Sequence, residues 1–445
     1  MAWRLGLVLA WLLGCGDNRT PPPTDLIGDL WVEQVAEGPA DRVLAIAIAP
    51  DGARGLVIAR ATAQGADFCE DCLDPASTDC GATCRRAVLD VTHRPDGGAP
   101  GLSHRFRQVF PETRDHDVTA LDVVAIDEAR VGVAWLECDR APCGAGQPKQ
   151  RCTARYTLVD LLTGRPGPVE TLYQGWYGDL QLAFDPRTGR LLAVVGTQGA
   201  SGTGVHAAIF DASGTTPIAP WRSYGGPGAR APAATASAGG FVIAADAPAP
   251  DEPGPMEPCA EACDCPDPGA SALAAGGLYA FSPGTGRAAE RISPGRPPDG
   301  VYSPREAIAA IDAGGRVIVA ASHAAGRTAE LFEPVVGGWL RRHASRAPVP
   351  LWLGALGDAS RLAWIGSEPV AGSPAEQRLV AGVVLLGQLD QRGELTELDR
   401  GAVIGVAPVR AGGAVRSTVL LRAVPAAGGG AATQRFEVLE VRADW

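Results

Sequence analysis

Cysteine is the residue type with the widest chemical scope in this chain, and its spacing allows two kinds of site. The 445 residues include eleven cysteines. One of them, Cys15, lies near the N-terminus, and the other ten are Cys69, Cys72, Cys80, Cys84, Cys138, Cys143, Cys152, Cys259, Cys263 and Cys265. The first four are spaced as Cys-x2-Cys and Cys-x3-Cys, which suits zinc ligands. An even set of ten also suits five disulfide bonds, which persist only in an oxidising compartment.

The first fifteen residues indicate that compartment. Met1-Ala2-Trp3-Arg4 carries one positive charge, and an apolar run follows that is far shorter than the roughly 20 residues needed to span a bilayer. The run ends in Leu12-Leu13-Gly14-Cys15, which resembles the lipobox of bacterial lipoproteins. The resemblance implies that residues 1–14 are a signal peptide and that Cys15 becomes the lipid-modified first residue. The alternatives are an ordinary secretory signal with a chance cysteine and a retained transmembrane anchor.

The segment that follows the cysteine predicts a tether and a location. Residues 15–28 are polar and proline-rich, so we expect an extended linker without packed structure. Position 16 is glycine, and by resemblance to the enterobacterial sorting rule, in which aspartate at this position retains a lipoprotein at the inner membrane, Gly16 favours the outer membrane. We therefore expect a cell-envelope protein that contacts the membrane through its N-terminal lipid, on the periplasmic side or at the cell surface.

Export favours the disulfide interpretation over the zinc interpretation for the ten remaining cysteines. Cys138 and Cys152 are expected to end a second strand and to begin a third, where they would lie side by side and pair. The simplest completion places two bridges within residues 69–84, one within residues 259–265, and one between Cys143 and the odd cysteine of that last group. No metal is predicted, because the acidic segments lack the spacing of an EF-hand calcium loop.

The six histidines form no recognisable catalytic or metal-binding motif. They are His93, His104, His116, His206, His323 and His343. None belongs to a His-x-x-x-His or His-Glu-x-x-His pair, so we expect them to be solvated or packed in the core. The sequence therefore predicts no catalytic residue and no cofactor, although groups from separate segments could still converge in the fold.

Composition restricts the partners and the class of fold. The formal net charge is −11, which disfavours nucleic acid as a partner. Hydrophobic residues make up 46% of the chain, so it can bury a core. The 57 glycines and 37 prolines favour short strands joined by turns over long helices.

A pattern of paired strands recurs seven times along the chain. In each copy an alternating strand leads through a turn to a second strand that is rich in large apolar residues. The turns lie at Asp51, Asp127, Asp185, Gly239, Asp312, Asp358 and Gly412. A third strand follows most copies, as at residues 156–160, 208–211 and 278–281, and a more polar fourth strand leads to the next copy. Four strands in a unit of about 40–50 residues are the signature of a β-propeller blade.

This order of strands resembles the WD40-like and quinoprotein-like propeller superfamilies over about residues 29–445. The resemblance implies an all-β domain, a seven-bladed β-propeller of four-stranded antiparallel blades with disulfide-rich loop insertions. Residues 30–35 would pair with residues 436–441, supply the missing outer strand of the last blade and close the ring. No Trp-Asp dipeptide ends the third strands, and the sialidase Asp box and the tryptophan docking motif of quinoprotein dehydrogenases are missing. The resemblance therefore indicates a fold but does not indicate a particular function.

Three long insertions join a second strand to a third strand, at residues 63–85, 138–153 and 247–275. Strands within a blade are antiparallel, so these connections are expected at one end of the ring. Two of the insertions are acidic, with Glu70, Asp71, Asp74, Asp79, Asp251, Glu252, Glu257, Glu261, Asp264 and Asp267. Bridged loops on a rigid scaffold are frequent binding sites, although bridges could also serve only to protect exported loops from proteolysis.

These features lead to two hypotheses about function. The first is a lipid-anchored propeller that binds a protein or a glycan of the cell envelope without catalysis. The alternative is a hydrolase or lyase of propeller fold that acts on exported polymers, with acidic residues near the axis.

Lipid attachment can be tested by replacing the sulfur atom of Cys15. Cys15→Ser removes the thiol that would be acylated, so we expect an unacylated precursor that no longer incorporates a fatty-acid analogue during metabolic labelling. Label on the variant equal to that on the unchanged protein would contradict the lipobox interpretation.

Overall fold

The computed structural model describes strands and turns between residues 32 and 442. The described ranges are 32–36, 42–50, 56–64, 86–94, 103–106, 116–141, 149–175, 178–196, 204–226, 228–248, 254–255, 276–293, 308–313, 316–323, 328–345, 349–356, 361–370, 373–385, 396–400, 402–411, 414–425 and 434–442. The predicted signal peptide, Cys15 and the tether lie outside these ranges, as do Cys69, Cys72, Cys80, Cys84, Cys143, Cys259, Cys263 and Cys265. Within the described ranges, no helix is long and apolar enough to cross a membrane.

The described residues form an all-β structure of antiparallel sheets, which confirms the predicted fold class at this level. The first sheet contains β2 (Arg42–Pro50), β3 (Leu56–Gln64), β4 (Arg86–Arg94) and β5 (Ser103–Phe106). The second contains β6 (His116–Ala125), β7 (Arg130–Ala141), β8 (Lys149–Asp160) and β9 (Glu170–Gly175). The third contains β10 (Asp179–Asp185), β11 (Arg190–Gly196), β12 (Val205–Asp211), β13 (Pro217–Tyr224) and the short β16 (Gly254–Pro255).

Four further sheets continue the same order. The fourth contains β14 (Arg230–Ser237), β15 (Gly240–Ala247), β17 (Gly277–Phe281) and β18 (Glu290–Arg291). The fifth contains β19 (Ile308–Ala313), β20 (Arg316–His323), β21 (Thr328–Val335) and β22 (Gly338–Ser345). The sixth contains β23 (Val349–Leu356), β24 (Arg361–Val370), β25 (Ser373–Leu385) and β26 (Thr396–Arg400). The seventh contains β27 (Ala402–Ala411), β28 (Ala414–Pro425), β29 (Gln434–Arg442) and β1 (Val32–Ala36).

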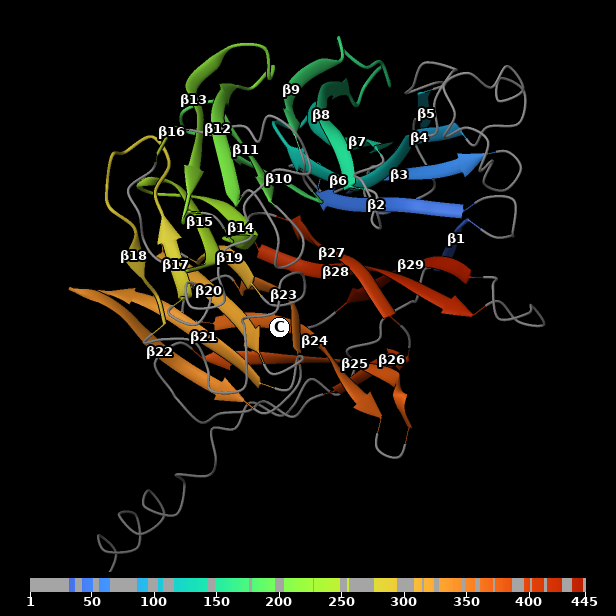
Figure 1. The fold of residues 1–445 in the computed structure, drawn as a ribbon. Helices are drawn as coiled ribbons and strands as arrows, with labels where there is room; N and C mark the ends of the chain where they lie inside the picture. The colour runs from blue at the N-terminus through green and yellow to red at the C-terminus, as the bar shows by residue number, and fades with distance from the viewer. Residues whose placement is uncertain are drawn as a thin grey trace, which may run out of the picture.

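The sheets follow one another around the molecule in chain order (Figure 1). The first strands of successive sheets lie next to each other, in the series β2, β6, β10, β14, β19, β23 and β27, and β27 also contacts β2. Four-stranded antiparallel sheets placed side by side through their first strands form an arrangement of the β-propeller type.

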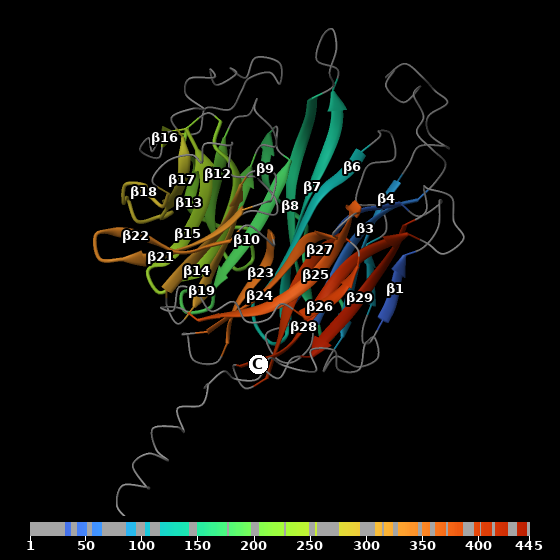
Figure 2. The same cartoon turned by 90° about the horizontal axis from the view of Figure 1, so that it is seen from below.

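The arrangement has two ends that differ in their connections (Figure 2). Antiparallel order places every connection from a second strand to a third strand at one end, which we call the insertion end. The turns from first to second strands and from third to fourth strands lie at the opposite end, which we call the turn end. Among the described residues, the turn end includes residues 126–129, 161–169, 186–189, 212–216, 238–239, 282–289 and 336–337.

The N-terminal strand pairs with the C-terminal strand, as the sequence predicts. β1 runs antiparallel to β29, with Val32 opposite Leu439 and Ala36 opposite Phe436. The sheet that contains the end of the chain therefore takes its outer strand from the beginning of the chain.

Second strands bury both of their faces where the structure describes their side chains, and β11 shows this most completely. Leu191, Ala193 and Val195 pack with apolar side chains of the second sheet, while Leu192 and Val194 pack with those of the fourth sheet. All five residues have no exposed surface. Burial of one leucine or valine side chain stabilises a fold by about 1.5–3 kcal/mol, so each sheet depends on a neighbour on either side.

Two insertions differ from the sequence prediction. The predicted segment 138–153 shortens to residues 142–148, because pairing between β7 and β8 continues from Cys138 opposite Cys152 to Ala141 opposite Lys149. Both cysteines therefore lie inside the two strands instead of at their ends. The insertion at 247–275 contains β16, which the sequence did not predict and which pairs with β13 of the preceding sheet.

A glycine at the turn end provides a test of packing between sheets. Gly214 has a φ of 75°, and a Cβ atom there would meet the ring of Tyr156, which is fully buried and donates a hydrogen bond to the Ala212 carbonyl at 2.8 Å. Gly189 has a φ of 65°, but a Cβ atom there would meet nothing within 4 Å.

We therefore expect Gly214→Ala to destabilise the protein more than Gly189→Ala does. Both variants bear the left-handed backbone cost of about 1–2 kcal/mol, and only Gly214→Ala adds an overpacking cost of about 1–3 kcal/mol. Urea unfolding of the two variants measures the difference. Equal losses of unfolding free energy would show that Tyr156 does not occupy this position.

Candidate functional site

The insertion end is built on a covalently joined pair of strands. Cys138 of β7 and Cys152 of β8 lie directly opposite each other and form a disulfide, which confirms their predicted pairing. The side-chain oxygen of Thr119 lies 3.0 Å from the sulfur of Cys138. The base of the connection at residues 142–148 is therefore attached to both strands and to β6.

An ion pair lies beside this disulfide. The guanidinium of Arg155 on β8 donates to the carboxylate of Glu137 on β7 at 2.7 Å, and it also donates to the hydroxyl of Thr171 on β9. Glu137 is buried, and a buried carboxylate needs such a partner to offset the loss of hydration. The pair holds three strands of the second sheet together near the insertion end.

The insertion of the fourth sheet extends over the edge of the third sheet. In β16, Gly254 lies opposite Ser223 and Pro255 lies opposite Arg222, both near the insertion end of β13. The indole of Trp221, also on β13, donates to the Leu172 carbonyl on β9 at 3.0 Å. The outer strands of the second and third sheets are thereby joined to the insertion of the fourth.

A carboxylate on an inner strand joins the first strands of two sheets. Asp122 of β6 accepts hydrogen bonds from the backbone N–H of Val123 at 2.8 Å and from that of Leu182, on β10, at 2.6 Å. Gln181 repeats this arrangement one sheet further on, where its side-chain oxygen accepts the N–H of Ala234, on β14, at 3.0 Å. Each polar side chain thus bridges to the following sheet.

The pKa of Asp122 differs strongly from that of an ordinary aspartate. Burial raises the pKa from 3.8 to about 7, and the hydrogen bonds from Leu182 and Val123 oppose this increase only in part. The residue retains some accessible surface, but protein atoms enclose its carboxyl group. A carboxyl group with this pKa can exchange a proton near neutral pH.

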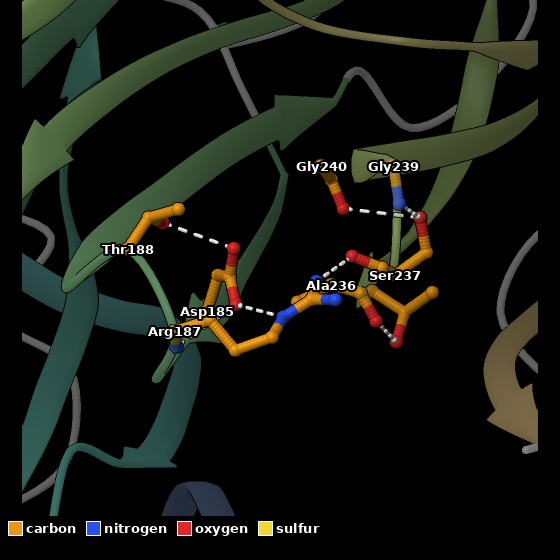
Figure 3. Close-up of polar contacts among 8 residues, drawn as sticks. Asp185, Arg187, Thr188, Ala236, Ser237, Gly239 and Gly240 are labelled. Carbon is orange, nitrogen blue, oxygen red and sulfur yellow. Dashed lines mark hydrogen bonds and ion pairs between the residues drawn. The ribbon is translucent and has the colours of Figure 1, made fainter. Parts of the chain in front are cut away.

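A second polar link lies at the turn end, where Arg187 extends from the third sheet to the fourth (Figure 3). Its guanidinium donates to the carboxylate of Asp185 at 3.0 Å and to the backbone carbonyl of Ser237. Burial raises the pKa of Asp185, but hydrogen bonds from Arg187 and Thr188 outweigh this effect, so the pKa lies below 3.8. Asp185 is therefore an ionised structural group that fixes the turn.

The other residues singled out from the sequence are placed only in part. The imidazole of His206 is buried on β12 and His93 on β4 is half-buried. These two histidines lie in different sheets, the third and the first. The side chains of His104, His116, His323 and His343 lie outside the described part of the structure. Within that part, no group of three His, Cys, Asp or Glu residues could hold a metal ion.

Asp122 and Gln181 were not singled out by the motif analysis. Their signal in the sequence is a polar residue inside an otherwise apolar strand, as in Leu121-Asp122-Val123-Val124. Burial of such a group requires hydrogen-bond partners, so the pattern could have indicated a structural or functional role. The identity of the partner strand could not have been read from it.

Asp122 should make the stability of the protein depend on pH. Its pKa is about 7 in the folded state against an ordinary value of 3.8, so the folded state binds the proton more tightly. The resulting stabilisation is complete below pH 3.8 and is lost as the pH rises through 7, with an upper limit of about 4 kcal/mol. We expect Asp122→Asn to abolish this decline.

Urea unfolding between pH 4 and pH 8 measures the effect as the difference in unfolding free energy between the variant and the unchanged protein. All other titrating groups are common to both proteins, so the difference should rise with pH in favour of the Asp122→Asn variant. A difference that stays constant across this range would show that Asp122 ionises normally.

Comparison with known proteins gives similarity in structure alone. No protein-family model matches the sequence, and no curated protein matches it. A protein of unknown function from Dyadobacter fermentans DSM 18053 has a TM-score of 0.45 at 9% identity, over 92% of this chain and 99% of that one. Hydrazine synthase from Kuenenia stuttgartiensis has a TM-score of 0.43 at 11% identity, over 87% and 94%.

An acylaminoacyl peptidase from Pyrococcus horikoshii has a TM-score of 0.40 at 10% identity, over 86% of this chain and 49% of that one. The chain therefore spans about half the length of this peptidase. At this level of similarity, no function is transferred from any of the three proteins.

Proposed function

We propose that this chain is a closed, seven-bladed β-propeller, held in the cell envelope by a lipid on Cys15, which binds a protein or a glycan at its insertion end without catalysis. The domain would comprise residues 29–445, after a signal peptide at 1–14 and a tether at 15–28. Nucleic acid is not a partner in this proposal, because the chain carries a net charge of −11.

Contacts between the first and last sheets support the closed ring. β27 contacts β2, and β1 adds to β29 as the outer strand of the seventh sheet. A sheet with two apolar faces is stable only when both are covered, and closure covers both faces of every sheet.

One observation carries the binding proposal: the insertion of the fourth sheet is hydrogen-bonded to the outer edge of the third through β16 and β13. The Cys138–Cys152 bridge fixes the base of the second sheet's connection on the other side of that same third sheet. Two connections with anchored bases beside one sheet suit a binding surface, because anchored ends reduce the entropy that loops lose on binding. A bridge between Cys143 and a cysteine of residues 259–265 would join them further, and it stays a prediction.

Asp122 favours one alternative function, a hydrolase or lyase acting on exported polymers. The Asp122 carboxyl group belongs to an inner strand, and its raised pKa suits a general acid or base. Its two backbone hydrogen bonds, however, already explain its position as a link between β6 and β10. We therefore place this function second.

The experiment compares variants at the two ends of the propeller. In one variant a two-residue Asn-Gly turn replaces residues 142–148, and in its matched control Leu162→Ser changes an exposed side chain at the turn end. Purified proteins are mixed with isolated cell-wall sacculi and with detergent-solubilised envelope proteins, and binding and the release of soluble fragments are both measured.

We expect the loop replacement to weaken binding by about tenfold or more, which corresponds to about 1.4 kcal/mol, while Leu162→Ser leaves binding unchanged. Equal binding by both variants would contradict a site at the insertion end. Release of soluble fragments that stops in Asp122→Asn would instead support the hydrolase or lyase.

A further inference from the structure

We infer that the turn end of the propeller rests against the lipid bilayer to which Cys15 is attached, so that the insertion end faces away from the membrane. This orientation rests on the proposed lipid anchor and adds a second contact with the membrane, made by the folded domain itself.

The direction of β1 determines where the tether leaves the domain. β1 is the fourth strand of its sheet and lies antiparallel to β29, so it runs from the turn end to the insertion end. Its first residue, Val32, lies opposite Leu439, and its last, Ala36, lies opposite Phe436 near the start of β29. The chain that leads back from Val32 to Cys15 therefore begins at the turn end.

The tether reaches the turn end more directly than the insertion end. Seventeen residue steps separate Cys15 from Val32, and an extended, proline-rich chain of this length spans about 50 Å. β7 has twelve residues, so the insertion end lies about 40 Å beyond the turn end. Bringing the insertion end to the bilayer would use most of the tether, whereas the turn end is where the tether leaves the domain.

The exposed apolar side chains are an independent observation that points to the same end. Among the residues whose surroundings the structure describes, six large hydrophobic side chains are exposed: Leu162, Val169, Ile218, Val335, Val336 and Leu340. Each of them lies in a turn of the turn end or within three residues of one. Leu162 is 74% exposed and Val336 is fully exposed. Exposed apolar side chains at one end of a domain can insert among lipid headgroups.

Exposed arginines also lie at the turn end, beside the exposed Asp127 and Glu128 of the second sheet. Arg165, Arg190 and Arg287 each follow a Thr-Gly pair at the turn end, and all three are exposed. Guanidinium groups bind lipid phosphates through paired hydrogen bonds. The aspartates of these turns are engaged internally, since Asp160 accepts the N–H groups of Leu162 and Thr163 at 2.9 and 2.8 Å. The acidic insertions join second strands to third strands, so they belong to the opposite end and avoid an anionic membrane surface.

Depth-dependent quenching in vesicles tests this orientation. Full-length acylated protein, purified from membranes, carries a fluorescent noncanonical amino acid at one exposed position. It is reconstituted into phosphatidylethanolamine–phosphatidylglycerol vesicles that contain brominated lipid. Leu162 and Val336 are the probe positions at the turn end, and the exposed Gln174 and Arg222 are the matched controls near the insertion end. Mass spectrometry of the Cys15 peptide measures acylation separately.

We expect the brominated lipid to remove most of the emission at positions 162 and 336 and little at 174 and 222. Quenching that is equal at all four positions, or stronger at 174 and 222, in acylated protein would overturn the orientation while leaving the lipid anchor intact. A Cys15 peptide without lipid would overturn the anchor and this orientation together.

Discussion

The whole fold depends on one constraint, which is that each sheet has two apolar faces and neither can remain in water. β11 is the clearest case, because its alternate side chains belong to two different cores, one shared with the second sheet and one with the fourth. A single sheet would expose one of these faces, and a stack of sheets would expose the outer face of the first and the last. A ring in which the first strands meet around a centre removes both exposed faces.

Polar links between the sheets supplement this packing and define their relative positions. The Tyr156 hydroxyl reaches the turn of the third sheet, Trp221 reaches the second sheet, and Arg187 reaches the fourth. Each of these links joins a side chain of one sheet to a backbone carbonyl of a neighbouring sheet. They therefore fix how far one sheet is shifted along its strands relative to the other. Apolar packing alone would tolerate small shifts along the strands, since it has no direction. The combination produces a rigid support for the connections at either end.

The two ends of that support have different chemistry, and this difference is the basis of the proposed function. The insertion end has the covalent Cys138–Cys152 bridge, the strand addition by β16 and acidic segments. The turn end has short turns closed by aspartates, exposed arginines and exposed apolar side chains. The proposed function, with membrane attachment at one end and partner binding at the other, requires such an asymmetry. The repeated strand order produces it directly, because every sheet presents the same type of connection on the same side.

The sequence by itself determined the features that depend on neighbouring residues. Alternation of apolar residues and the turn signals predicted the paired strands, including β2 with β3 and β10 with β11, because side chains of a strand alternate between faces whatever packs on them. It also predicted that Cys138 would meet Cys152 and that the first strand would join the last. The tertiary structure alone decided which groups meet across sheets: the bond from Leu182 to Asp122, the pairing of β16 with β13, and the continuation of β7 and β8 past their cysteines. These contacts join segments far apart in the chain, and their energy depends on burial and geometry that exist only after the sheets have packed.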